Sequence, residues 1–320
     1  MYDRVKFYFP YIHSQQDYDY VRKQSGVEAF DSYDLNSGEV RRGKTDFCGF
    51  HVDFTSFGMY VSGSLNKLIH GGSNLFDMDL EQTKEAIQKL TDSLQLDFFN
   101  AKLIELEFGV NLIVRHKPDL YFSRLVEYPR KHRDQISKTS LYFVRENKND
   151  SERIKFYDKI VEATKNKMAI PDEYKEKNVL RVEMSWSKKL ARQLNEYDVK
   201  GQTLCETDFY NKLLDKFCDS YEKIKKQKII DCDMTKIKSS NDLADYVLAD
   251  IFSMVTDFDE QVEARLQQAK EANVLKSARD YTRAKDRIRR MKEKLKADGQ
   301  DPLLNELNNS FAEIRQRRRV

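Results

Sequence analysis

Glycine is distributed so unevenly along this chain that it divides the sequence into two kinds of structure. Most of the 11 glycines fall before residue 75, where they separate short segments rich in residues that suit β-strands. From about residue 187 glycine nearly disappears, and apolar residues recur at helical spacing. We therefore expect an α+β domain over residues 1–200 and a helical, partly basic domain over residues 201–320.

Hydrophobic periodicity predicts the elements of the first domain. The expected strands are residues 5–9, 50–54, 59–64, 102–114, 140–144, 153–159 and 179–186. A helix is expected at about 78–95, with Asp77 or Asp79 as its N-cap. Residues 117–135 indicate a second helix or an irregular excursion, and 164–177 a charged loop. In the second domain, residues 241–270 predict a long amphipathic helix.

Composition excludes several classes of protein. The four cysteines and five histidines show no zinc-ligand spacing, and free thiols in a reducing compartment are the expected state of the cysteines. No apolar run approaches the ~18 residues that cross a membrane, and the N-terminal segment lacks the features of a signal peptide. We expect a soluble intracellular protein without a membrane partner. Its mildly basic pI, about 8.4, permits nucleic-acid binding.

Charged residues stand inside two apolar strands. Glu105 and Glu107 lie two positions apart and so leave the same face of a strand, and Arg181 and Glu183 do likewise. Charge in such a place is costly unless that face is wet or the charge is paired. A solvent-facing stripe explains each pair on its own, whereas several pairs that converge would indicate a site.

Tyr157 is the candidate nucleophile. In an extended segment it shares a face with Lys155 and Lys159, and two ammonium groups would favour its phenolate form. The chain has 17 tyrosines, so a lysine-flanked tyrosine alone is an ordinary feature. The motifs around it give the stronger indication.

Four short motifs follow one another in a characteristic order. They are Ser64-x-x-Lys67 leading to Gly71 and Asn74, a strand with Glu107, Tyr157-x-Lys159-x-x-Glu162, and Leu180-Arg181-x-Glu183. This succession resembles the gene II replication proteins of filamentous phages and related rolling-circle initiators of phages and plasmids. The resemblance covers residues 1–200 and implies a Rep nickase-like fold, with an antiparallel sheet and flanking helices.

The resemblance also implies a reaction. Tyr157 would attack a phosphate at the replication origin, form a 5′-phosphotyrosine and leave a free 3′-OH that primes synthesis. Lys159 would stabilise phenolate or phosphate charge. If so, Tyr157, Glu107 and Glu183 should converge on one face of one sheet. A single tyrosine fits the motif, so the second cleavage could use a second protomer, the same site again, or water.

Carboxylates are the implied metal ligands. Glu107 and Glu183 match the acidic positions of the family, and Mg²⁺ or Mn²⁺ suits their hard oxygens. Glu162 would be a ligand or the partner of Lys159, and Arg181 would hold a phosphate or a carboxylate. Many rolling-circle nickases carry a histidine–hydrophobic–histidine motif that this chain lacks. The metal would then rest mainly on carboxylates, with one histidine, His51 or His70, as an option.

Several further residues are candidate DNA contacts. Ser64, Lys67 and Asn74 would touch the backbone near the site, or else form a strand–turn unit bent at two glycines. Lys155 is a further candidate beside Tyr157. Residues 276–296 hold ten Lys or Arg against three Asp or Glu, which indicates phosphate binding or a solvated helix. The contacts proposed there are Arg283, Arg287 and Arg290.

We therefore expect a metal-dependent nickase that acts on single-stranded or cruciform origin DNA in the cytoplasm of a bacterial host. Its helical domain would bind origin duplex or a host protein such as a helicase. The alternative is a replication or partition factor that binds DNA without cutting it. A tyrosine recombinase fits poorly, because its dispersed Arg/His set cannot be assembled from this sequence.

Overall fold

The computed structural model describes residues 2–12, 14–25, 30–33, 40–47, 49–55, 57–145, 152–227, 239, 258–272, 274–275, 277–297 and 301–317. These residues form two compact units. The first comprises Met1–Phe122, Glu127–Lys225 and Ser310–Val320, and the second Ser123–Val126 and Lys226–Asn309. The domain boundary expected near residue 200 stays a prediction, and the unit that holds the sheet extends to Lys225.

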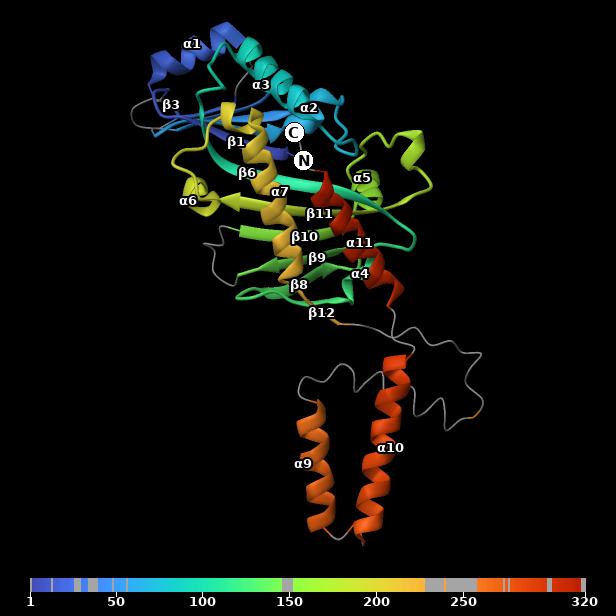
Figure 1. Cartoon of the computed structure of the whole chain (residues 1–320). Coiled ribbons are helices and arrows are strands. Elements are labelled where there is room, and N and C mark those ends of the chain that lie inside the picture. The colour runs from blue at the N-terminus through green and yellow to red at the C-terminus, as the bar shows by residue number, and fades with distance from the viewer. Residues whose placement is uncertain are drawn as a thin grey trace. The chain divides into compact units, whose positions relative to one another are not determined.

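A ten-stranded sheet is the frame of the first unit (Figure 1). Its order is β2-β3-β4-β5-β1-β6-β11-β10-β9-β8, and its neighbouring strands pair antiparallel. The strands are β1 (Tyr2–Phe9), β2 (Phe30–Tyr33), β3 (Val40–Phe47), β4 (Phe50–Thr55), β5 (Gly58–Ser64), β6 (Lys102–Val114), β8 (His132–Ser137), β9 (Ser140–Val144), β10 (Glu152–Asp158) and β11 (Asn178–Ser187). Short strands β7 (Leu125–Glu127) and β12 (Lys225–Lys226) pair separately. The expected α+β fold with an antiparallel sheet is confirmed.

Helices cover one face of this sheet with aromatic side chains. Helix α7 (Thr207–Glu222) crosses the sheet (Figure 1), and its Tyr210 meets Tyr2 of β1 and Phe108 of β6 at ring-centroid distances of 6.0 and 5.7 Å. Helix α11 (Pro302–Gln316) adds Phe311, which stacks on Tyr221 at 3.7 Å. Buried aromatic residues therefore pack this face of the sheet against the helices. The polar residues of the same strands lie on the opposite face.

Helix α3 (Leu80–Leu94) forms where its sequence predicts it. Asp79 caps it and makes a reciprocal capping box with Gln82. The predicted strands are all present, whereas helix α1 (Gln15–Ser25), β2 and β3 have no counterpart in the prediction. The excursion expected over 117–135 contains helix α4 (Asp119–Phe122) and two strands, and the loop over 164–177 contains the short helix η1 (Asp172–Tyr174).

One predicted boundary is wrong in a way that matters for the site. The strand expected over 153–159 ends at Asp158, and Lys159 begins helix α5 (Lys159–Lys165). The Asp158 carboxylate accepts from the backbone N–H groups of Ile160 and Val161 and so caps the new helix. Lys159 therefore lies on a helix and no longer alternates with Tyr157.

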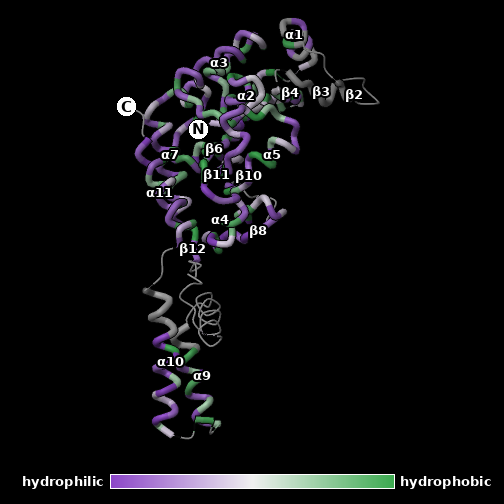
Figure 2. The backbone as a smooth tube through the Cα atoms, turned by 90° about the vertical axis from the view of Figure 1, so that its right-hand side faces the viewer, coloured by the Kyte–Doolittle hydropathy of each residue, from purple (hydrophilic) through white to green (hydrophobic). Residues whose placement is uncertain are grey.

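The second unit contains two helices that lie side by side, α9 (Phe258–Glu271) and α10 (Ala278–Ala297) (Figures 1 and 2). Glu263 of α9 joins them by accepting from Tyr281 and from Lys285, the latter at 2.9 Å. Of the helix expected over 241–270, residues 258–270 are helical and 241–257 lie outside the described residues. No helix among the described residues is long and apolar enough to cross a membrane.

Candidate active site

The polar face of the sheet brings four adjacent strands together at one place. In the register of β10 and β11, Lys155 lies opposite Glu183 and Tyr157 opposite Arg181. On the other side of β11, Glu183 lies opposite Gly109 of β6. Residues directly opposite in an antiparallel pair share a face of the sheet. The charged residues of these strands therefore form one cluster, which is the convergence of charged pairs that would indicate a site.

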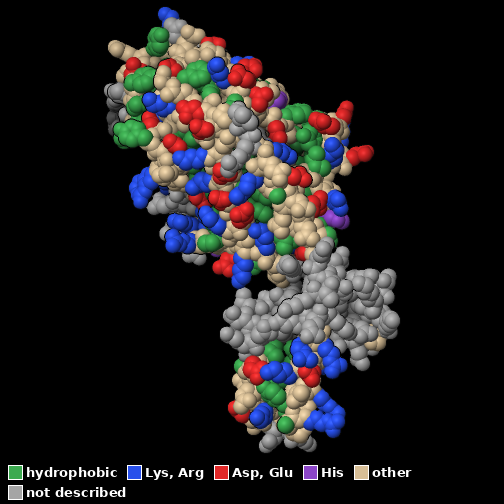
Figure 3. Space-filling model, in the orientation of Figure 1, with side chains coloured by type: hydrophobic (Ala, Val, Ile, Leu, Met, Phe, Trp, Pro, Cys, Tyr) green, Lys and Arg blue, Asp and Glu red, His purple; other side chains and the backbone are tan. Residues whose placement is uncertain are grey.

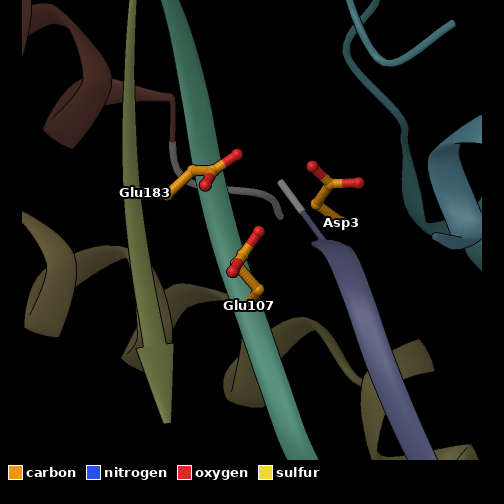
Figure 4. A group of neighbouring side chains, drawn as sticks. All are labelled: Asp3, Glu107 and Glu183. Carbon is orange, nitrogen blue, oxygen red and sulfur yellow. The ribbon is translucent and has the colours of Figure 1, made fainter. Parts of the chain in front are cut away.

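Three carboxylates form the centre of the cluster. Asp3 of β1, Glu107 of β6 and Glu183 of β11 point toward one another (Figure 4). Each offers an oxygen within 4.8 Å of those of the other two. Three hard oxygen ligands from a rigid sheet suit Mg²⁺ or Mn²⁺. We call these residues the carboxylate trio. Asp3 was not among the predicted ligands, although it too is a charge inside a strand.

Arg181 holds two members of the trio, Asp3 and Glu183, in place. Its guanidinium is buried and donates through Nε to Glu183 at 2.6 Å and through Nη2 to Asp3 at 2.6 Å. Nη1 donates to the Asn74 carbonyl at 3.1 Å and to the Asn111 side chain at 3.0 Å. Arg181 was expected to hold either a phosphate or a carboxylate. In the structure it binds carboxylates.

Gly109 makes room for this guanidinium. A Cβ atom at residue 109 would lie 2.9 Å from Arg181 Nη2 and 3.0 Å from Glu183 Cγ, closer than real Cβ atoms approach or at the very limit. The absence of a side chain at position 109 therefore leaves room for the Arg181 guanidinium beside β6.

Tyr157 lies beside the trio and donates its hydroxyl proton to Glu183 Oε1 at 2.7 Å. Tyr157, Glu107 and Glu183 thus converge on one face, as expected, while their chemical roles stay predictions. Burial, and next the charge of Glu183, raise the pKa of Tyr157 well above its ordinary value. The expectation that two lysines favour its phenolate is wrong in this structure, because both lysines bind carboxylates.

The two lysines have different partners. Lys155 Nζ lies 3.1 Å from Glu107 Oε2 and 3.4 Å from Glu183 Oε2. Lys159 Nζ donates to Glu162 Oε2 at 2.6 Å and lies 5.8 Å from the centroid of the Tyr157 ring. Burial lowers the pKa of Lys159.

Glu162 lies outside the trio. Besides accepting from Lys159, it accepts from the Asn166 side chain at 2.6 Å. Of the two roles expected for Glu162, partner of Lys159 or metal ligand, the contacts support the first. Glu105 also lies apart and faces Lys6 at 3.8 Å.

Burial and the neighbouring charges together separate the pKa values of two members of the trio. Burial, and then the charge of Glu183, raise the pKa of Glu107 to about 7. Burial also acts to raise the pKa of Glu183, but Arg181 and Lys155 outweigh it and lower that pKa to about 2. Glu107 therefore takes up a proton near neutral pH, whereas Glu183 stays ionised.

The end of β5 and the segment after it support Asp3 with hydrogen bonds. Ser64 caps helix α2 (Leu65–Ile69) and donates its hydroxyl proton to Asp3 Oδ1. Asn74 donates to Asp3 Oδ2 at 2.7 Å. Ser64 and Asn74, both predicted DNA contacts, therefore contact a carboxylate of the trio. The alternative prediction, a strand followed by a turn, did not include helix α2. Lys67 lines the adjoining pocket.

A pocket of about 540 Å³ opens over the trio. Helices α2 and α5 contribute to its wall, and Tyr157 and Lys155 line it. His51 lies on the wall but outside the trio, so it is not brought together with the carboxylates. His70 packs against Phe76, and burial lowers the pKa of its imidazole.

The predicted DNA-contacting arginines Arg283, Arg287 and Arg290 are exposed on α10 of the second unit. Lys and Arg side chains gather along the visible side of this helix (Figure 3). Lys285 of α10 forms an ion pair with Glu263 of the neighbouring helix α9.

Comparison with known proteins places this chain in a family. The family model that describes the N-terminal part of the replication-associated gene II protein of phages matches residues 1–216, which is more than half of the chain. Among solved structures, the rolling-circle replication initiator protein from Geobacillus stearothermophilus is 10% identical, with a TM-score of 0.39, over 78% of this chain and 95% of that chain. No curated protein matches. The chain therefore belongs to the family of phage replication-associated gene II proteins, through the N-terminal domain that this family model describes.

Proposed function

We propose that this chain is a rolling-circle initiator that nicks one DNA strand at a phage or plasmid origin, with Tyr157 as the nucleophile. The observation that carries the proposal is that the Tyr157 side chain lines the pocket while its hydroxyl donates a hydrogen bond to a carboxylate of the trio. A phenol, a carboxylate that orients it and a group of metal-ligating oxygens at one point are components of phosphoryl transfer.

The reaction balances with the groups at hand. The Tyr157 oxygen attacks the phosphorus, oriented by the hydrogen bond that it donates to Glu183 at 2.7 Å, and its proton passes to water. The bond from phosphorus to the 3′ oxygen breaks, which yields a 5′-phosphotyrosine and a 3′ oxygen that takes up a proton from water. Lys159, close to the tyrosine ring, offsets negative charge on the phosphate.

Mg²⁺ or Mn²⁺ would be held by Asp3, Glu107 and Glu183. When bound, the cation polarises the phosphate and stabilises charge on the attacking and leaving oxygens. Arg181 keeps Asp3 and Glu183 in fixed orientations.

DNA binding would involve both units. Phosphates of single-stranded or cruciform origin DNA would meet pocket-lining cations such as Lys67. Arg283, Arg287 and Arg290 on α10 would add salt-dependent contacts with origin duplex. Residues 201–320 would form the helical domain, and a host helicase is a further candidate partner. The protein would act in the cytoplasm of a bacterial host.

A covalent-capture assay tests the nicking. The protein is incubated with a labelled, mixed-sequence single-stranded DNA pool and Mn²⁺ or Mg²⁺, and adducts are resolved on a denaturing gel. We expect an adduct that Tyr157→Phe abolishes and that a chelator prevents. Tyr60→Phe, which removes a half-buried hydroxyl elsewhere on the sheet, should keep it. An undiminished adduct in Tyr157→Phe would exclude Tyr157 as the nucleophile.

The second candidate is a DNA-binding replication or partition factor that does not cut. The raised pKa of Tyr157 favours it, because a structural tyrosine needs no activation. DNA binding without any adduct, with either metal and with origin duplex as well as single strands, would support this alternative.

A further inference from the structure

Lys155 occupies an unusual position within the site. Its ammonium lies between two members of the trio, 3.1 Å from Glu107 Oε2 and 3.4 Å from Glu183 Oε2. The strand register fixes this arrangement, because Lys155 lies directly opposite Glu183 across β10 and β11. The side chain is 24% exposed and lines the pocket.

The two cations of the cluster are held very differently. Arg181 donates to Asp3 and Glu183 and is also anchored by an amide and a carbonyl from outside the trio. Among the described residues, the hydrogen bonds of Lys155 Nζ go to Glu107 and Glu183 alone. Arg181 is therefore a fixed part of the frame, whereas the lysine can swing away on its flexible stem.

A divalent cation and this ammonium need the same oxygens, Glu107 Oε2 and Glu183 Oε2, whereas Arg181 donates to Glu183 Oε1 and Asp3 Oδ2. Mg²⁺ approaches its ligand oxygens to about 2.0–2.1 Å, so an ammonium that stayed on the same two oxygens would be strongly repelled. We propose that Lys155 is a built-in competitor of the metal. Metal binding displaces its ammonium from Glu107 and Glu183 into the pocket, where it is available to a DNA phosphate.

The consequence is a link between metal and DNA. With Lys155 on the carboxylates, the pocket presents one cation fewer to the backbone. Once the metal takes those oxygens, the released ammonium adds a phosphate contact to the charge that the metal itself brings. Metal should therefore strengthen DNA binding by more than its own charge provides, and DNA should strengthen metal binding to the same extent. This inference rests on the proposed metal site and on the proposed DNA substrate.

Metal affinity gives the first test. Mn²⁺ binding is measured by titration calorimetry on the full chain for wild type, Lys155→Met and Lys155→Gln. Removing the competitor should tighten Mn²⁺ binding about tenfold or more, the effect of losing a charge-assisted hydrogen bond. Lys6→Met is the matched control, because Lys6 carries the same charge next to Glu105, which lies outside the trio. Its affinity should stay within about twofold of wild type.

The DNA link gives the second test. All variants carry Tyr157→Phe, so that no covalent step intervenes, and a mixed-sequence single-stranded oligonucleotide is the probe. Mn²⁺ should raise the oligonucleotide affinity of the lysine-containing protein several-fold more than that of the Lys155→Met protein.

The outcomes separate this inference from the nickase proposal. A tightened Mn²⁺ affinity in both Lys155 variants, together with a reduced metal effect on DNA binding, supports the inference even if no DNA adduct ever forms. Unchanged or weaker Mn²⁺ binding in folded Lys155→Gln overturns it, as does absence of Mn²⁺ binding to wild type. Equal metal effects on DNA binding with and without Lys155 refute the release of the ammonium to DNA.

Discussion

Replacing Gly109 by alanine tests whether the trio depends on room for Arg181. The added Cβ would lie 2.9 Å from Arg181 Nη2, which itself donates to Asp3 at 2.6 Å. The guanidinium can move away only by giving up part of its hydrogen bonding. The same Cβ would press on Glu183 Cγ at 3.0 Å.

The expected magnitude follows from two opposing effects. Losing one buried hydrogen bond between charged groups costs about 1.5–3 kcal/mol. Alanine recovers about 0.5–1 kcal/mol because it restricts the unfolded chain more than glycine does. Gly109→Ala should therefore lower the free energy of unfolding by about 1–2 kcal/mol, which corresponds to a drop in Tm of about 2–8 °C for a unit of this size.

Thermal unfolding and Mn²⁺ titration together provide the assay. Mn²⁺ affinity should fall along with Tm, because Asp3 and Glu183 lose their fixed orientations. Ile113→Ala is the control, since this residue lies on the same strand, is 54% exposed and should leave Mn²⁺ affinity unchanged. A Gly109→Ala protein with wild-type Tm and wild-type Mn²⁺ affinity would refute this account of Arg181.

Three further predictions concern other parts of the molecule. The pKa of Glu107 is raised to about 7, so the stability contributed by its protonated form is present at low pH and is lost as pH rises through that value. Mn²⁺ binds the ionised carboxylate. The rise in Tm on adding Mn²⁺ should therefore be larger at about pH 8 than at about pH 6. Phe311→Ala should cost about 3–5 kcal/mol in a denaturant titration, because it removes a ring stacked on Tyr221 at 3.7 Å, and a cost below about 1 kcal/mol would contradict that packing. Replacing three exposed arginines of α10 by alanine should weaken the salt dependence of duplex binding. The slope of log K against log salt concentration should become smaller in magnitude by about 2.7, and an unchanged slope would exclude these contacts. The three are Arg283, Arg287 and Arg290.

Local sequence patterns predicted those elements whose formation depends on neighbouring residues alone. Helix α3 follows from its apolar spacing and Asp79, and strands β9 and β10 follow from two runs of strand-forming residues. The strand end at Asp158 was missed, because Tyr157 and its neighbours alternate as a strand does. The capping ability of Asp158 was the available signal.

The site was harder to predict because its contacts are not local. A buried charge inside a strand indicated that Glu107, Arg181 and Glu183 needed partners, but not which partners. Asp3 joins them because β1 pairs with β6, and no spacing in the sequence reports that pairing. For the same reason the sequence placed Lys155 beside Tyr157 without showing that two carboxylates hold its ammonium.

The contact between Arg181 and Asp3 joins residues 178 positions apart, and this separation bears on when the site can form. Asp3 is synthesised well before Glu183, which leaves the ribosome only after β6 and β10. At about 5–20 residues per second, many seconds of synthesis separate the first trio carboxylate from the last. A nascent chain that ends before β11 therefore has no complete trio, and contacts so distant in sequence also slow folding. The proposed nicking would thus be confined to chains whose synthesis has passed β11.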